Sequence, residues 1–237
     1  MNNKNILYQH GTLALLVPGL LEGTITMGEL FSHGDTGIGT GQGLDGELIM
    51  LDGVPYQIDS TGTVNLVKDD FTLPFATTHS ASFNEFSDFN NLDMSSFEQT
   101  IIEKSNSQNT FFSVITKGEF SKMKTRAVAK SNKPYPTLVQ TAKEQSIFES
   151  DRVSGTLLTY YSPEVFHGVA VGGCHSHFLA DDHSIGGHVL DFQLEHGKSE
   201  IQVFDTLEQH LPINNSEYMN HNFDNDSIGS AIDEAEK

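Results

Sequence analysis

The sequence predicts an α+β protein made of two packed subdomains, each built on mixed β-sheets with a few short helices. Three observations lead to this fold class. Short β-branched and aromatic runs bounded by glycine recur along the chain, helix signals are few and short, and strand character is strongest in the last third. With 237 residues, 37% of them hydrophobic and 19% charged, the chain is long and apolar enough to bury a substantial core.

The first elements are short and separated by turn signals. Thr26 and Glu29 have capping-box spacing and predict a helix over residues 26–33. A glycine-rich loop is expected over residues 34–43. An apolar run at 47–51, the turn pair Asp52-Gly53 and a second run at 56–58 then predict a buried hairpin.

The middle of the chain mixes helix and strand signals. Residues 76–93 have no clear period and are expected to form loop and strand pieces, after which Ser95 and Glu98 are expected to open a helix through residues 101–102. Runs at 111–115 and 120–128 predict a second hairpin that turns at Lys117-Gly118. Pro136 is expected in the first turn of a helix over residues 138–143.

The last third is strongly β, with strands predicted over 155–161, 169–178 and 188–195. Beyond Pro212 the chain turns polar, so we expect a loop over 214–225 and then a short helix capped by Asp226 and running through residues 228–232. This division predicts an N-terminal α+β subdomain at 1–140 and a C-terminal, β-rich subdomain with a tail at 141–237.

Charge and cysteine content narrow the class of function. Lys and Arg number 13 against 32 Asp and Glu, so the formal net charge is -19, which disfavours nucleic acid or an anionic membrane as a partner. An anionic small-molecule substrate would therefore need local positive charge from a metal or an arginine. The single cysteine, Cys174, rules out an internal disulfide. The apolar run at 13–21 is short and broken by Pro18 and Gly19, so we expect no signal peptide and a cytoplasmic protein.

Three histidines form a pattern typical of a metal site. His175 and His177 are two apart on a predicted strand and so point to the same face, whereas Cys174 points to the other face and is expected to be a buried small residue. A glycine-rich turn then returns the chain to His188. Three imidazoles with open coordination positions predict a catalytic zinc site, although any one histidine alone is more often an ordinary polar residue. The remaining histidines considered are expected on the surface or in loops: His167, His183, His196 and His210.

These residues lie within longer stretches that resemble acetolactate decarboxylases. The matching stretches are His33-Gly34-Asp35, Gly37-Ile38-Gly39-Thr40, Leu44-Asp45-Gly46-Glu47-Leu48, Lys124-Thr125-Arg126, Lys133-Pro134-Tyr135 and the segment from Asp181 to Phe192. Each is weak alone, but together, in this order, they are specific and span nearly the whole chain. The resemblance implies a metal-dependent homodimer that converts (S)-2-acetolactate into (R)-acetoin and carbon dioxide without an organic cofactor.

The resemblance also implies roles for individual residues. It places zinc on His175, His177 and His188, and the active-site glutamate on Glu47. It places the carboxylate-binding arginine on Arg126, the pocket threonine on Thr40 and a second glutamate in the tail on Glu236, with Glu234 as the neighbouring choice. Two positions depart from the family pattern: Ala129 replaces a proline, and His183-Ser184-Ile185 replaces a more basic stretch at the rim of the site.

The reaction explains why such residues would be needed. Loss of carbon dioxide leaves an electron pair that a Lewis acid such as zinc can stabilise as an enediolate, and a guanidinium can hold the carboxylate that leaves. A carboxyl group with a raised pKa, assigned to Glu47, can then protonate one face. Without the resemblance, Glu47 would be interpreted as a solvent-facing residue at the start of a strand, and Arg126 as part of a solvated basic stripe with Lys122 and Lys124. Thr40 would be interpreted as an ordinary turn residue.

Two other functions fit part of the pattern. A cupin-like non-haem iron oxygenase also begins its site with two histidines one residue apart, but it needs a carboxylate ligand soon afterwards, and Asp181 or Asp182 is a poor substitute for the usual glutamate. A non-catalytic module with a structural zinc would need a fourth protein ligand, and Cys174 faces away from the histidines.

Overall fold

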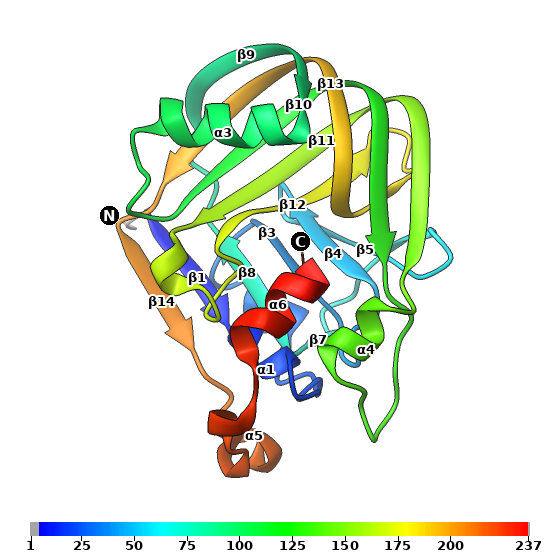
Figure 1. The fold of residues 1–237 in the computed structure, drawn as a ribbon, viewed down its shortest axis with the longest axis vertical. Helices are drawn as coiled ribbons and strands as arrows, with labels where there is room; N and C mark the ends of the chain where they lie inside the picture. Colours follow the sequence, from blue (N-terminus) through cyan, green and yellow to red (C-terminus); the bar gives the residue numbers. More distant parts are fainter. Residues whose placement is uncertain (1–4, 237) are drawn as a thin grey trace.

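Two large β-sheets form the framework of this computed structural model, which describes residues 5–236 (Figure 1). The first sheet has seven strands. Their order is β14 (Thr206–His210), β1 (Ile6–His10), β8 (Phe75–His79), β3 (Thr36–Thr40), β4 (Glu47–Leu51), β5 (Val54–Ile58) and β6 (Val64–Leu66). Only the β1–β14 pair is parallel, so the sheet is mixed.

The second sheet has five longer strands and closes on itself. Their order is β10 (Phe112–Ala127), β11 (Ser146–Ser162), β12 (Gly173–Ala180), β13 (Gly186–Val203) and β9 (Asn84–Asp93). Strand β13 also pairs with β10, which curls the sheet into the arch at the top of Figure 1. A separate two-stranded sheet joins β2 (Ile25–Thr26) to β7 (Thr72–Leu73). The predicted α+β class is confirmed.

The helices are short and lie around the sheets. They are α1 (Leu13–Leu16), α2 (Met27–Leu30), α3 (Met94–Ser105), α4 (Leu138–Ala142), α5 (Ser216–Asn220) and α6 (Ile228–Glu236), with 3-10 turns η1 (Glu164–Phe166) and η2 (Phe223–Asn225). The Thr26–Glu29 capping box is present at α2, as predicted. Helix α5 and turn η2 lie in the stretch expected to be loop, and α6 runs four residues beyond the predicted end.

Two predicted helix starts are wrong in detail. Helix α3 is capped by Asp93, whose carboxylate accepts from the Ser96 N–H at 2.8 Å, so the Ser95–Glu98 box is not used. Helix α4 is capped by Thr137 in a box with Gln140, which leaves Pro136 before the cap instead of in the first turn. In both cases a better cap stands one or two residues from the predicted one.

The glycine-rich stretch at 34–43 is not a loop, because residues 36–40 form the central strand β3. Its glycines allow a close approach to β8. A Cβ on Gly37 would lie 2.3 Å from the carbonyl oxygen of Thr77, and one on Gly39 would lie 2.7 Å from that of Phe75. These glycines therefore make room for a neighbouring strand.

The predicted hairpin at Lys117-Gly118 is also wrong, because β10 continues without a turn from 112 to 127. Gly118 pairs with Gly155 on β11 and with Gly197 on β13, so three glycines lie side by side across the sheet. A Cβ on Gly118 would lie 2.3 Å from the carbonyl oxygen of His196. The hairpin at Asp52-Gly53 is confirmed, with both residues at positive φ.

The two sheets pack on each other through buried side chains from both. This core includes Ile38, Ile49 and Ile58 of the seven-stranded sheet and Leu158 and Leu179 of the five-stranded sheet. Each sheet uses chain from both sides of residue 140, since β14 joins the first and β10 joins the second. Neither sheet is confined to one side of residue 140, and the division into subdomains 1–140 and 141–237 stays a prediction. Among residues 5–236, no helix is long and apolar enough to cross a membrane.

Candidate metal centre and its pocket

Three histidines of the five-stranded sheet point one nitrogen each toward a common point. His175 and His177 lie on β12, and His188 near the start of β13 pairs directly with His177. The three nitrogens all lie within 4.8 Å of one another, so these residues are positioned to bind a metal ion. The predicted hairpin that brings His188 beside the first two histidines is confirmed.

The imidazole nitrogens that face one another in this cluster are in the state needed to bind a metal ion. The Nδ1–H of His177 donates to the Leu48 carbonyl at 2.8 Å, which leaves Nε2 with a lone pair, and this buried atom has no hydrogen-bond partner. His175 Nε2 and His188 Nδ1 face each other at 3.0 Å. Burial lowers the pKa of His175 to about 3 and the pKa of the other two well below the usual value. Neutral imidazole is the form that binds metals.

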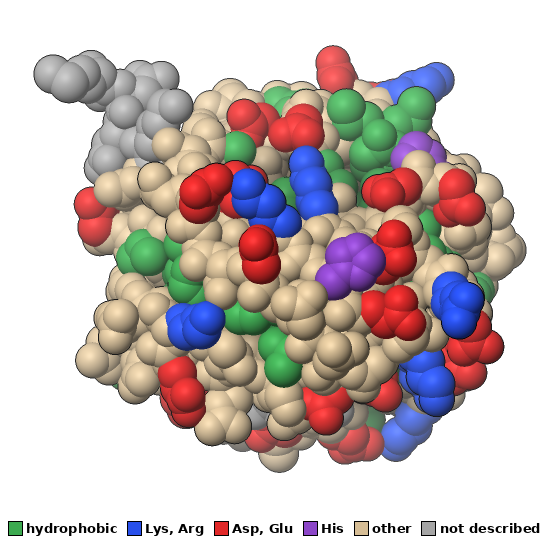
Figure 2. Space-filling view, turned by 90° about the horizontal axis from the view of Figure 1, so that it is seen from above, with side chains coloured by type: hydrophobic (Ala, Val, Ile, Leu, Met, Phe, Trp, Pro, Cys, Tyr) green, Lys and Arg blue, Asp and Glu red, His purple; other side chains and the backbone are tan. Residues whose placement is uncertain are grey.

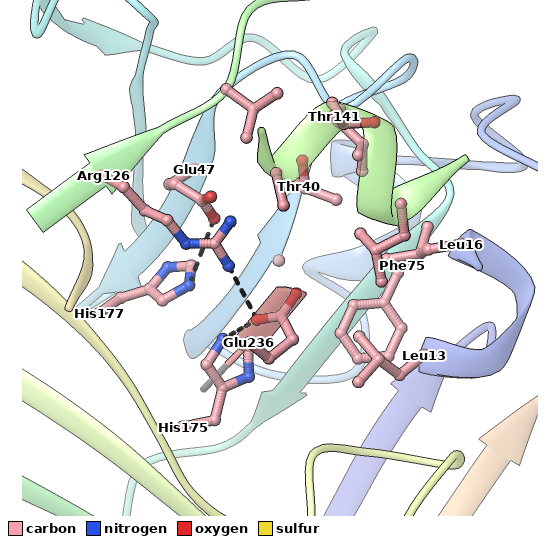
Figure 3. A pocket seen from close by; sticks show the side chains of 15 residues that line it. Leu13, Leu16, Thr40, Glu47, Phe75, Arg126, Thr141, His175, His177 and Glu236 are labelled. Carbon is pink, nitrogen blue, oxygen red and sulfur yellow. Dashed lines mark hydrogen bonds and ion pairs between the residues drawn. The ribbon is translucent and has the colours of Figure 1, made fainter. Parts of the chain in front are cut away.

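A buried ion pair lies against the cluster (Figure 3). Arg126 on β10 pairs with His188 across the sheet, and its Nη2 lies 3.0 Å from Oε2 of Glu236 at the end of α6. The same oxygen is 3.7 Å from His188 Nδ1 and 3.9 Å from His175 Nε2. Glu234 instead points outward, with 58% of its side chain exposed and Lys143 as its partner. Glu236 is therefore the tail glutamate that reaches the site.

Arg126 keeps part of its guanidinium free. The residue is 3% exposed, and its Nε is buried without a hydrogen-bond partner. A buried donor without a partner is costly, so this atom is a natural contact for an anionic ligand. The guanidinium also opposes the effect of burial on Glu236, but burial dominates and raises the pKa of that carboxyl group above its usual value.

Glu47 begins β4 and approaches the cluster at His177, whereas Glu236 approaches it at His175 and His188. Its Oε2 lies 3.5 Å from His177 Nε2, and the residue is 8% exposed. Burial raises the pKa of Glu47 to about 7, with Arg126 acting in the opposite direction. A carboxyl group with this pKa can hold or release a proton near neutral pH.

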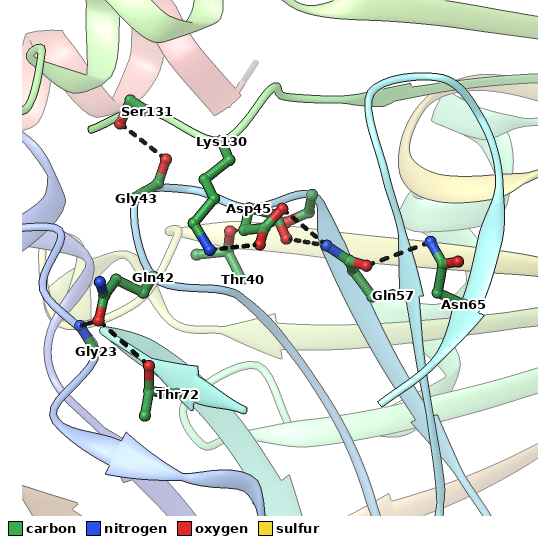
Figure 4. A network of polar contacts seen from close by, with 11 residues as sticks. Gly23, Thr40, Gln42, Gly43, Asp45, Gln57, Asn65, Thr72, Lys130 and Ser131 are labelled. Atoms are coloured by element: carbon green, nitrogen blue, oxygen red, sulfur yellow. Dashed lines mark hydrogen bonds and ion pairs between the residues drawn. The ribbon is translucent and has the colours of Figure 1, made fainter. Parts of the chain in front are cut away.

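The loop 41–46 joins β3 to β4 and so connects Thr40, the last residue of β3, to Glu47, the first residue of β4. Figure 4 shows the polar contacts that hold this loop. Asp45 in this loop receives hydrogen bonds from Gln57 at 2.8 and 2.9 Å and from Lys130 at 3.0 Å. The Thr40 hydroxyl donates to the Gly46 carbonyl at 2.8 Å. Its proton is thus used within the loop, and its oxygen remains as an acceptor toward the pocket.

The opposite wall of the pocket is apolar and was not predicted from the sequence. The pocket comprises about 460 Å³ of space, partly open to solvent. Its apolar lining comes from α1, β8, α4 and nearby loops: Leu13, Leu16, Leu44, Phe75, Val128, Leu138 and Ala142. The run at 13–21 contained a usable signal, because a short apolar segment broken by Pro18 and Gly19 that does not cross a membrane must be buried against something else.

The other candidate residues lie away from the cluster. Cys174 packs against the core on the other face of β12, as predicted, but is only partly buried. His183 and His210 are exposed, and so is His196, whose side chain is 59% exposed. His167 is an exception, because only 13% of its side chain is exposed and it contacts α6. It lies in the loop between β11 and β12, as expected of a surface or loop histidine, but most of its side chain is covered.

Comparison with known proteins gives a consistent family. A sequence model of alpha-acetolactate decarboxylase matches residues 7–225. The alpha-acetolactate decarboxylase of Lactococcus lactis subsp. lactis (strain IL1403) is 38% identical over 232 residues, covering 97% of this chain and 98% of the relative. The crystal structure of the Bacillus subtilis strain 168 enzyme superimposes with a TM-score of 0.94 at 33% identity, covering 98% and 99%. The structure of a Staphylococcus aureus protein described as similar to alpha-acetolactate decarboxylase superimposes with a TM-score of 0.95 at 37% identity. The match covers 98% of this chain and 100% of that protein.

Proposed function

The chain belongs to the alpha-acetolactate decarboxylase family, whose members are carboxy-lyases, and we propose that it converts (S)-2-acetolactate into (R)-acetoin and carbon dioxide with zinc as its metal. The observation that carries this proposal is the cluster of three neutral, buried imidazoles, in which His177 Nε2 has no hydrogen-bond partner within the described residues. His175, His177 and His188 would hold the ion. A bound zinc ion supplies a Lewis acid that lowers the energy of negative charge on the substrate's ketone and hydroxyl oxygens.

Arg126 is proposed to bind the carboxylate that leaves. Its unpartnered Nε faces no competing protein acceptor, and Glu236 fixes the orientation of the guanidinium through Nη2. A bidentate grip would set the breaking bond at an angle to the ketone plane that allows the electron pair to delocalise. The bond from C2 to the carboxylate carbon breaks and carbon dioxide departs. The electron pair of that bond remains on C2 and the adjacent carbonyl as an enediolate.

Glu47 is proposed to return the proton. Its carboxyl group is buried beside His177, with a pKa raised to about 7 by burial, and is therefore able to carry a proton at neutral pH. Protonation of C2 from one side only would give a single acetoin enantiomer. Thr40, whose own proton is donated to Gly46, can accept a hydrogen bond from the substrate hydroxyl.

The two competing functions receive less support from the arrangement. Asp181 and Asp182 are exposed in the turn between β12 and β13, so neither stands in for the carboxylate ligand of a cupin-like oxygenase. A structural zinc site normally has all four positions filled by protein groups. Here the cluster opens onto a pocket lined by Arg126, Glu47 and apolar side chains.

The direct test supplies purified protein with racemic 2-acetolactate under anaerobic conditions and measures acetoin and carbon dioxide, with and without a chelator. We expect both products in equal amounts, loss of turnover with chelator, and recovery on adding zinc. Metal analysis should find about one zinc per chain. Bound iron with oxygen uptake would favour the oxygenase, and no acetoin from zinc-loaded protein would refute the proposal.

Replacing a ligand separates a catalytic metal from a structural one. In His188→Ala we expect loss of bound zinc and of acetoin formation, with a cooperative unfolding transition retained, because the two sheets pack through a core independent of the cluster. Exposed His196 provides the matched control, and His196→Ala should keep both zinc and turnover. Unfolding of His188→Ala together with metal loss would favour the structural interpretation.

A further inference from the structure

The loop between β11 and β12, residues 163–172, contacts three parts of the proposed active site. The N–H groups of Leu13 and Ala14, at the start of α1, donate to the carbonyls of Val169 and Gly168, each at 2.9 Å. At its end the loop leads into β12, which bears two of the cluster histidines. Through His167 it also reaches α6, which bears Glu236. A single loop therefore connects the apolar wall, the metal cluster and the tail.

Both ring nitrogens of His167 are engaged. The Gly172 N–H donates to Nδ1 at 3.1 Å, so the ring proton is on Nε2, which donates to the Gly229 carbonyl at 3.3 Å. Asp233, one turn further along α6, places Oδ1 3.9 Å from the same Nε2. The ring comes this close to Gly172 because that residue has no side chain. A Cβ there would lie 3.2 Å from Nδ1 and 2.4 Å from Glu164 Oε2.

The contact with Gly229 fixes the beginning of a rigid helix whose end carries Glu236. Glu236 lies seven positions beyond Gly229, a distance of about 10 Å along the axis. The other side of α6 packs through Ile232 and Ala235 against the core around the pocket. Apolar packing of this kind holds the helix against the wall but permits sliding and rotation, whereas a hydrogen bond with a fixed donor specifies one position.

We propose that His167 is a positioning residue, whose Nε2–H group holds the first turn of α6 so that Glu236 meets Arg126 and the cluster histidines. The functional part of this inference rests on the proposed decarboxylase activity, in which Glu236 orients Arg126. The tether itself does not depend on that activity.

Two substitutions separate the two contacts of the ring. In His167→Gln the amide nitrogen lies where Nε2 was and can still donate to Gly229, whereas in His167→Asn the amide oxygen lies where Nδ1 was and can accept only from Gly172. We expect His167→Gln to keep kcat within about 3-fold of wild type and His167→Asn to lose about 10-fold or more in kcat with little change in KM. Equal activity of the two variants would overturn the proposal.

A second readout does not require activity. In metal-free protein, amide hydrogen exchange over residues 228–236 should be faster in His167→Asn than in wild type and His167→Gln, while exchange over β10 stays unchanged. Unaltered exchange of α6 in His167→Asn would overturn the tether. If wild-type protein makes no acetoin but α6 responds as expected, the proposed function fails and the tether stands.

A double-mutant cycle distinguishes positioning from general destabilisation. When His167→Asn is added to Glu236→Gln, kcat should fall by less than about 2-fold relative to Glu236→Gln alone, because the carboxylate being positioned has already been removed. A cost as large as in the wild-type background would show that His167 acts on something else and would refute the proposal. His196→Asn, at an exposed histidine on β13, serves as the control and should leave kcat and exchange unchanged.

Discussion

Arg126 combines three properties that a lysine would not provide. The residue is 3% exposed and lies between Glu47 and Glu236. Its Nη2 pairs with Glu236, while its Nε has no hydrogen-bond partner. We predict that Arg126→Lys lowers kcat/KM for 2-acetolactate by at least about 100-fold, because an ammonium group cannot grip a carboxylate bidentately while holding Glu236. Steady-state kinetics of zinc-loaded protein test this.

Lys124 offers the matched control on the same strand. Its side chain is 40% exposed and pairs with Glu149 on the surface, so Lys124→Ala should stay within about 2-fold of wild type. Retention of full activity by Arg126→Lys would mean that a single positive charge is sufficient. The proposed bidentate grip would then be abandoned.

His79 should make the stability of the fold depend on pH. The ring is fully buried, shares a hydrogen bond with the Tyr160 hydroxyl at 2.8 Å, and burial lowers its pKa to about 3. The pKa of this histidine is about 6.5 in the unfolded chain and about 3 in the native protein. At pH values between these two, the unfolded chain binds a proton that the native protein does not bind, so the free energy of unfolding decreases as pH falls. This residue alone should cost about 2 kcal/mol of unfolding free energy between pH 7 and 5.

Denaturant unfolding of metal-free protein at several pH values tests the prediction. His79→Gln should lower stability at every pH yet show a shallower decrease toward acid than wild type. The comparison isolates His79, because the two proteins differ at this residue alone. Parallel pH profiles for the two proteins would assign the acid sensitivity to other groups.

The prediction of individual site residues succeeded where local pattern fixes geometry. Two histidines one residue apart on a strand must share a face, and a glycine-rich turn returns the chain to the third. Glu47 and Arg126 had no such local signal, because each is covered by residues distant in sequence: Glu47 contacts His177 on β12, and Arg126 contacts Glu236 on α6. The apolar run at 13–21 indicated burial, but no short-range pattern tells which core residues border a cavity, so Leu13, Leu16 and Phe75 were missed as pocket residues.

Among the elements, strand β10 depends on a row of three glycines. Gly118 lies between Gly155 and Gly197, and a Cβ there would lie 2.6 Å from the Gly197 Cα. We predict that Gly118→Ala destabilises the fold by about 1–3 kcal/mol, because the backbone of β13 would have to move aside. The corresponding fall in Tm is roughly 2–4 °C per kcal/mol for a chain of this size.

Thermal unfolding of Gly118→Ala and of the neighbouring, exposed Lys117→Ala provides the measurement. The lysine variant should unfold within about 1 °C of wild type, as expected for a surface change. A stable Gly118→Ala would show that the strands can separate here at no cost. The glycine row would then be incidental to the curl of the sheet.

The elements that were mispredicted share a cause. Glycine was interpreted as a turn signal at 34–43 and at Gly118, but in both places it permits one strand to approach another that is distant in sequence. The Thr26–Glu29 capping box and the Asp52-Gly53 turn were predicted correctly because the stabilising contacts lie within a few residues. The pairing of β14 with β1 joins residues 200 apart, and no local pattern reports it.

For the molecule as a whole, the distribution of charge opposes the proposed substrate. The net charge is -19, and the face seen in Figure 2 shows acidic side chains scattered among lysines and arginines instead of gathered in one patch. Within the site, the positive charge of Arg126 is offset by Glu236 and, when ionised, by Glu47. An approaching anion therefore meets a repulsive field until it is close to the metal cluster.

This balance predicts an unusual salt dependence. Raising ionic strength from 0.01 to 0.1 M shortens the screening length from about 30 to about 10 Å, which weakens the repulsion by the whole surface more than attraction at contact. The KM for 2-acetolactate should then fall by about 2- to 5-fold with kcat unchanged. Chloride and methanesulfonate salts should act alike if screening is the cause, whereas an anion that competes for Arg126 would raise KM. A KM that rises with both salts would mean that attraction of the substrate by the site outweighs repulsion by the surface charge even at long range. The surface charge would then not oppose substrate capture.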